Sequence, residues 1–170
     1  IAQTVDRQVA DNDALMHVFS AGNSNNQNCG YGAGNQWGNI TGGHKIGKNV
    51  MATANLFADE SLVNSSSRGP AHDGRIKPDI AAHGQGQLST DPFNQYQSFG
   101  GTSAAAPSMA GNMGQLYQAY KSWHNGVNPP SALIKAAVMN TAHDLGNVGP
   151  DFRYGFGRIH TLRAYELLRD

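Results

Sequence analysis

The length of 170 residues allows one domain with a sizeable core, and the formal net charge is zero at pH 7 with histidine neutral. Charged residues make up 14% of the chain and no run of basic residues stands out. The sequence therefore has no basic patch of the kind that binds nucleic acid. No apolar stretch approaches the roughly 18 residues that span a membrane, and the single Cys29 excludes an internal disulfide.

The first part of the chain is expected to alternate helix and buried strand. Apolar residues at every fourth position predict a helix over Ile1–Val9. Leu15–Phe19 is a short apolar run, typical of a strand that is buried on both faces, and Asn49–Ala54 predicts the next such strand. Between them, residues 23–48 are rich in Gly and Asn without clear periodicity, and a loop of this length is usually functional.

The rest of the chain continues the alternation of strands and helices, which implies a parallel sheet. Pro is well placed at the start of a helix, and turn residues punctuate the other segments. The expected elements are a strand at Pro78–Ala82, a hairpin over Gln87–Phe99 around Asp91-Pro92, a helix over Ser103–Lys121, a helix that starts at Pro129–Ser131, a turn at Tyr154–Gly157 and an amphipathic helix over Thr161–Leu168.

Ser103 follows a Gly-Gly pair and opens an apolar, Ala-rich segment. Glycines let the backbone bend sharply and let a substrate approach, and a helix start adds unpaired N–H groups and a positive dipole end. A serine at such a place is by itself more often a helix cap. The longer string Gly-Thr-Ser-x-x-x-Pro-x-x-Ala-Gly, from Gly101 to Gly111, is more specific, because Pro107 inside a helix removes a backbone donor.

Asn23 ends the block Ser20-Ala21-Gly22-Asn23, which follows the apolar run Leu15–Phe19. A side-chain amide can donate a hydrogen bond to the negative charge that develops on a carbonyl oxygen during acyl transfer. The Asn23 block and the Ser103 block, 80 residues apart and in this order, resemble two signature blocks of the subtilisin-like serine proteases, the subtilases. Weaker matches are Asp73–Ile80 and Tyr154–Ile159.

This resemblance implies an α/β, subtilisin-like three-layer fold with a mostly parallel central sheet, of which residues 1–170 would be the carboxy-terminal part of a catalytic domain. It implies that Ser103 is the nucleophile, that Asn23 belongs to the oxyanion hole, and that no cofactor is required for the chemistry. Structural calcium is frequent in the family, but no ligand cluster can be assigned. One departure is His83, which stands where the family commonly has Pro. The residues expected to contact substrate are Ser20, Ala21, Gly22, Gly101 and Thr102.

The other two members of the family's catalytic triad, an Asp and a His that precede the serine, have no counterpart in this sequence. None of the seven histidines lies in the family's His-Gly-Thr-His block. We therefore expect a partner, an amino-terminal fragment of the same protease on a preceding segment or a separate chain, that carries Asp and His and covers the open sheet edge. The chain starts at Ile1 without a signal peptide, which favours a start created by proteolytic processing or by deliberate truncation. Its low charge and abundant Asn, Gln, Ser and Gly favour a secreted hydrolase.

Two other interpretations stay open. A sedolisin-like serine-carboxyl peptidase also has a Gly-Thr-Ser-Ala block, but that family has Asp where Asn23 stands and ends in an Asp-rich calcium loop. A non-catalytic, degenerate protease half could act in binding or assembly, although Ser103 and Asn23 are both intact. The Asp and His of the missing portion would decide between an enzyme and a degenerate half.

Overall fold

A computed structural model describes residues 1–29 and 31–169. Short parallel strands form a three-stranded sheet in the order β1-β2-β3, and the remaining two strands form a separate antiparallel hairpin. The elements are α1 (Ala2–Asp11), β1 (Val18–Ser20), β2 (Met51–Leu56), β3 (Ile80–His83), β4 (Gln87–Asp91), β5 (Gln95–Phe99), α2 (Thr102–Trp123), α3 (Ser131–Asn140) and α4 (Thr161–Arg169).

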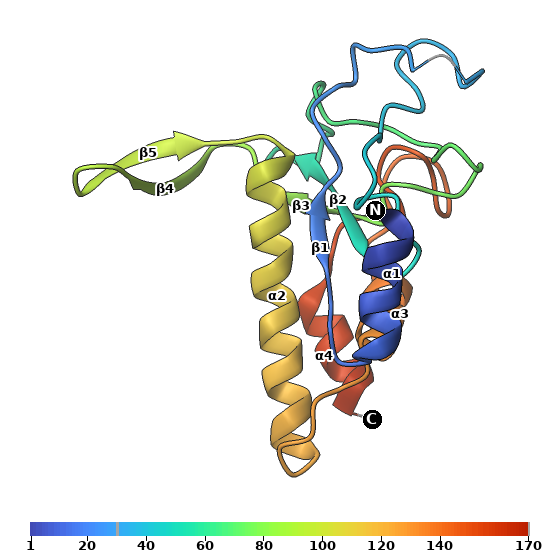
Figure 1. Ribbon diagram of the computed structural model, residues 1–170. Helices are drawn as coiled ribbons and strands as arrows, with labels where there is room; N and C mark the ends of the chain where they lie inside the picture. The colour runs from blue at the N-terminus through green and yellow to red at the C-terminus, as the bar shows by residue number, and fades with distance from the viewer. Residues whose placement is uncertain (30, 170) are drawn as a thin grey trace.

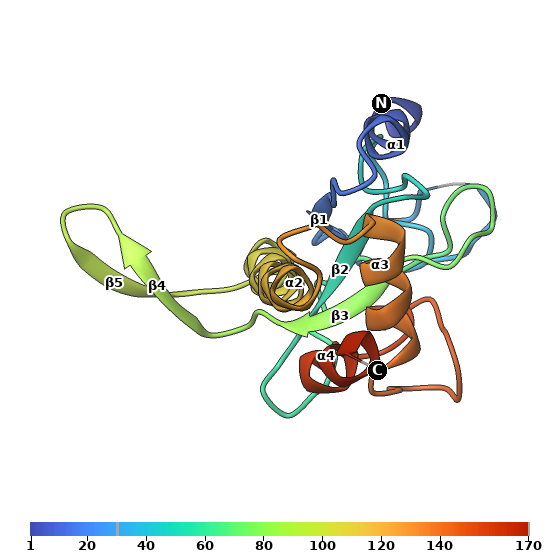
Figure 2. The same cartoon turned by 90° about the horizontal axis from the view of Figure 1, so that it is seen from below.

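The helix α2 packs along one face of this sheet and contacts all three strands, and in two perpendicular views it runs alongside them (Figures 1 and 2). On the opposite face Ala54, Leu56 and Ala81 pack against Leu62, Leu145 and Tyr154, which lie outside the helices. The last helix, α4, packs against both α2 and α3. The parallel sheet confirms what the alternation of strands and helices predicts, and the mixed α/β architecture is the fold class that the family resemblance implies.

The main core is built where α2 meets the sheet and continues to α3 and α4. Buried side chains recur along α2 at helical spacing, because residues three and four apart share one face. The same cluster takes in apolar residues of β2, β3, α3 and α4. Its members include Met51, Ile80, Met109, Met113, Leu116, Ile134, Val138 and Ala164. The long helix α2 is therefore held rigidly, with its first turn near the carboxyl ends of the strands.

The strand β1 corrects one expectation from the sequence. The run Leu15–Phe19 was expected to be a strand buried on both faces, but strand pairing begins at Val18, and all three residues of β1 are only half-buried. The reason is position, since β1 pairs with β2 on one side and lies at the edge of the sheet within the described part of the chain. In contrast, β2 is central and every one of its residues is buried, as its apolar composition predicts.

The β4–β5 hairpin extends away from the rest of the molecule (Figure 1). Its tip carries Phe93, whose side chain is 95% exposed and whose φ is +64°. A left-handed backbone strains most residues, whereas Asn adopts it readily.

We expect Phe93→Asn to raise the free energy of unfolding by about 1 kcal/mol, because strain is relieved and no buried area is lost. Urea unfolding would measure this change, and a lower stability of the variant would contradict it.

Candidate active site

The first turn of α2 places Ser103 at the surface. Ser103 is the second residue of the helix, and its side chain is exposed. Since the first N–H groups of a helix have no acceptor within it, the Ser103 N–H is available for a ligand. In the described part of the chain neither this N–H nor the Ser103 hydroxyl makes a hydrogen bond to protein.

Asn23 is held against this turn by Thr102. The Asn23 Oδ1 accepts hydrogen bonds from the Thr102 N–H and from the Thr102 hydroxyl, both at 3.0 Å. The Thr102 Oγ1 in turn accepts a hydrogen bond from the Gly22 N–H at 3.2 Å. Because Oδ1 must face the Thr102 N–H, the orientation of the amide is fixed and its Nδ2 points elsewhere. Among residues 1–29 and 31–169, Nδ2 has no hydrogen-bond acceptor.

Gly101 is required for this close approach. Its φ is +80°, a conformation that favours glycine, and a Cβ at this position would lie 3.1 Å from the Asn23 Nδ2. The Gly-Thr-Ser tripeptide thus has a separate task for each residue. Gly101 admits the amide, Thr102 orients it, and Ser103 presents its hydroxyl.

Two of the residues expected to contact substrate have a different position in the structure. Thr102 and Ala21 are both fully buried, with an exposed fraction of zero. They cannot offer surface to a ligand, and their contribution is to position their neighbours. Ser20 and Gly22 are half-buried, as is Gly101, and these three stay candidates for substrate contact.

The sequence model of the subtilase family matches residues 1–157 of this chain. The chain belongs to the subtilase family. This match includes both the Asn23 block and the Ser103 block.

Among similar proteins, the C5a peptidase of Streptococcus pyogenes is 43% identical over 95 residues, which are 55% of this chain and 8% of that protein. The membrane-bound transcription factor site-1 protease of Mus musculus is 31% identical over 125 residues, which are 70% of this chain and 12% of that protein. The chain therefore spans only a small part of the length of these relatives. A solved structure of the PatG macrocyclase in complex with peptide shares the fold, with a TM-score of 0.75 and 19% identity, over 98% of this chain and 47% of that one.

No histidine of this subtilase contacts Ser103 in the described part of the chain. Each has a local partner instead. His17 contacts Gln8, His44 packs on Phe19, His72 on Tyr31 and His124 on Tyr120, while His143 lies near Glu60 and the His160 ring accepts from the Arg163 N–H. His83, at the end of β3, has its Nδ1 2.8 Å from the Phe57 carbonyl oxygen, which ties β3 to the loop after β2. The general base that Ser103 would need is thus not among these side chains.

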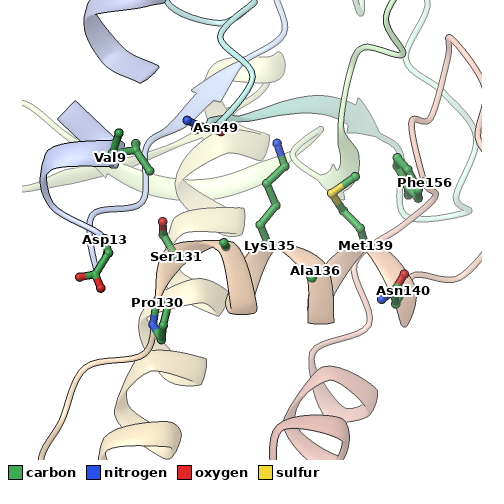
Figure 3. Close-up of a pocket in the computed structure, with 12 residues that line it drawn as sticks. Val9, Asp13, Asn49, Pro130, Ser131, Lys135, Ala136, Met139, Asn140 and Phe156 are labelled. Carbon is green, nitrogen blue, oxygen red and sulfur yellow. The ribbon is translucent and has the colours of Figure 1, made fainter. Parts of the chain in front are cut away.

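Two cavities in the described part of the chain differ in their lining and in their place relative to the site. One, of about 480 Å³, is lined by polar residues that include Asn23, Asn64 and Arg68. The other, of about 580 Å³, is mostly apolar and lies between α1 and α3 (Figure 3). Lys135 points across this second cavity, and its ammonium is fully engaged by the Lys48 and Val50 carbonyls and by Asp79. Within the described residues the cation of the second cavity is engaged by protein acceptors, and neither Ser103 nor Asn23 lines it, so the candidate site is the turn at Ser103.

The structure also bears on metal and membrane binding. No group of three or more His, Cys, Asp and Glu side chains within the described ranges could hold a metal ion. No helix described here has the length and apolar character needed to cross a membrane.

Proposed function

We propose that this chain carries the nucleophile and the oxyanion hole of a serine endopeptidase. Ser103 would attack the carbonyl carbon of the scissile peptide bond and form an acyl-enzyme, with release of the amine. The Ser103 N–H and the Asn23 Nδ2 would donate hydrogen bonds to the negative oxygen of the tetrahedral intermediate. The observation that supports this most is the pair of unpaired donors beside an exposed serine at a helix start.

A serine hydroxyl is a weak nucleophile unless a base takes its proton. We propose that this base is a His, oriented by an Asp, on a preceding segment or a separate chain. The His would accept the Ser103 proton, pass it to the leaving amine, and later activate the water that hydrolyses the acyl-enzyme. The half-buried edge strand β1 supports a partner of this kind, since an open strand edge is prone to pairing. The interface would bury more than roughly 2,000 Å², as obligate pairs do, and the assembled enzyme would be secreted.

A fluorophosphonate probe tests the proposal, because it labels activated serines. We expect labelling at Ser103 in the protein that contains the Asp and His segment, and little or no labelling or peptide hydrolysis by the 170-residue chain alone. Mass spectrometry of the digested protein locates the label. Ser103→Ala should abolish labelling, whereas Ser108→Ala, one turn further along α2, should not. Labelling at another serine, or efficient hydrolysis by the chain alone, would refute the assignment.

A degenerate half that acts only in binding is the second candidate. The intact hydrogen bonds between Asn23 and Thr102 count against it, because decay would remove the pressure to keep them. A completed protein in which Ser103 never reacts with the probe would favour this alternative.

A further inference from the structure

Lys45 lies against the backbone that precedes Asn23. Its Nζ is 2.8 Å from the place that a Cβ of Gly22 would occupy, and its Cε is 3.4 Å from the corresponding place at Gly42. Both glycines have positive φ values, +114° and +103°. The end of the lysine side chain therefore occupies space that is open because Gly22 lacks a side chain.

The ammonium of Lys45 has no partner within residues 1–29 and 31–169. It makes no ion pair and no hydrogen bond there, although the side chain is half-buried. Burial lowers the pKa of Lys45 below that of an ordinary lysine, and no neighbouring carboxylate opposes this effect. A cation that is partly removed from water without a counter-charge is unfavourable, unless a ligand supplies that charge.

The other lysines near the sheet show that this arrangement is unusual. Lys77 and Lys135 both reach the carboxylate of Asp79, and Lys135 also donates to two backbone carbonyls. These two lysines stabilise the fold. Lys45 has none of these acceptors, so a purely structural role leaves its charge unexplained.

The position of Gly22 relates Lys45 to the substrate. The Gly22 N–H donates to Thr102, and the Gly22 carbonyl accepts from the Ser67 N–H at 2.7 Å, so this backbone is fixed on both sides. Asn23 follows directly, and its Nδ2 would bind the carbonyl oxygen of the attacked residue. Consecutive Cα atoms lie about 3.8 Å apart, so the Lys45 ammonium lies beside the residue directly before Asn23.

We infer that Lys45 makes this peptidase select an acidic residue, Asp or Glu, immediately before the scissile bond. The inference rests on the proposed function and adds the class of substrate. A carboxylate in that position would pair with the unpartnered ammonium through a charge-assisted hydrogen bond.

The test uses the completed peptidase and four succinyl-Ala-Ala-Pro-X-p-nitroanilides in which X is Glu, Gln, Leu or Lys. We expect kcat/KM for Glu to exceed that for Gln by about tenfold or more, since the two side chains differ in charge but not in shape. Lys45→Gln should remove this difference, and labelling of Ser103 by the fluorophosphonate probe shows that the variant folds. Lys45→Glu should shift the preference from Glu to Lys.

Lys48→Gln is the matched control, because Lys48 is an exposed lysine of the same loop, and it should keep the preference for Glu. Equal rates for Glu and Gln in the parent, or a loss of all rates alike in Lys45→Gln, would overturn the inference. In either case labelling of Ser103 and hydrolysis of the Leu substrate by the parent would persist. Failure of the proposed function would instead abolish labelling and all four activities together.

Discussion

Asn23→Asp is expected to lower kcat of the completed peptidase by about 10²–10³-fold, a magnitude already known for the oxyanion-hole asparagine of subtilisin, itself a member of this family. The reason is specific to one atom. The Asp side chain keeps an oxygen that can accept from the Thr102 N–H and hydroxyl, as the Asn23 Oδ1 does at 3.0 Å. It replaces the donating Nδ2 with a negative oxygen that would repel the oxyanion.

The measurement is kcat at neutral pH, together with thermal unfolding to show that the fold is unchanged. Asn64→Asp is the matched control, because Asn64 lines the same polar cavity and its side chain is exposed. That variant adds the same negative charge nearby. It should change kcat by less than about threefold, because an exposed charge interacts only weakly with its surroundings. If Asn23→Asp retained full activity with an intact fold, Asn23 would have no part in the oxyanion hole.

Asp79→Ala is expected to reduce the free energy of unfolding by about 3–5 kcal/mol, because it leaves a buried ammonium without its carboxylate. Lys77 is 1% exposed and lies 2.5 Å from the Asp79 Oδ2, which also accepts the Ala52 N–H at 2.7 Å. Burial lowers the pKa of Lys77, and the Asp79 charge opposes that shift. The Asp79 side chain thus satisfies two lysines and a backbone donor of β2 at once.

Urea unfolding of Asp79→Ala, of Lys77→Met and of the double variant Lys77→Met/Asp79→Ala forms a double-mutant cycle. We expect the double variant to be more stable than Asp79→Ala, because it removes both charges. Asp73→Ala is the control, since Asp73 pairs with Arg75 at the surface and should change stability by less than about 1 kcal/mol. Equal effects of Asp73→Ala and Asp79→Ala would contradict the buried ion pair as a source of stability.

The sequence by itself determined the order and type of most elements and the two signature blocks. Short apolar runs, turn residues and the helix-start prolines are local signals, and local signals depend on residues a few positions apart. The helix that begins beside Ser103, the hairpin over 87–99 and the central strand β2 were predicted for this reason. Ser103 and Asn23 were found because each is embedded in a specific string.

Only the tertiary structure decided how deeply each residue is buried and which distant residues meet. The burial of β1 depends on which strands pair beside it, a long-range property that an apolar run cannot reveal. Thr102 and Ala21 belong to the signature blocks, yet packing places both of them out of reach of a substrate. Lys45 lies in a loop without periodicity, 23 positions after Gly22, and only the path of that loop brings its ammonium to Gly22. Contacts between residues far apart in the sequence depend on the folded path of the whole chain. Many residues together contribute the energy that selects this path.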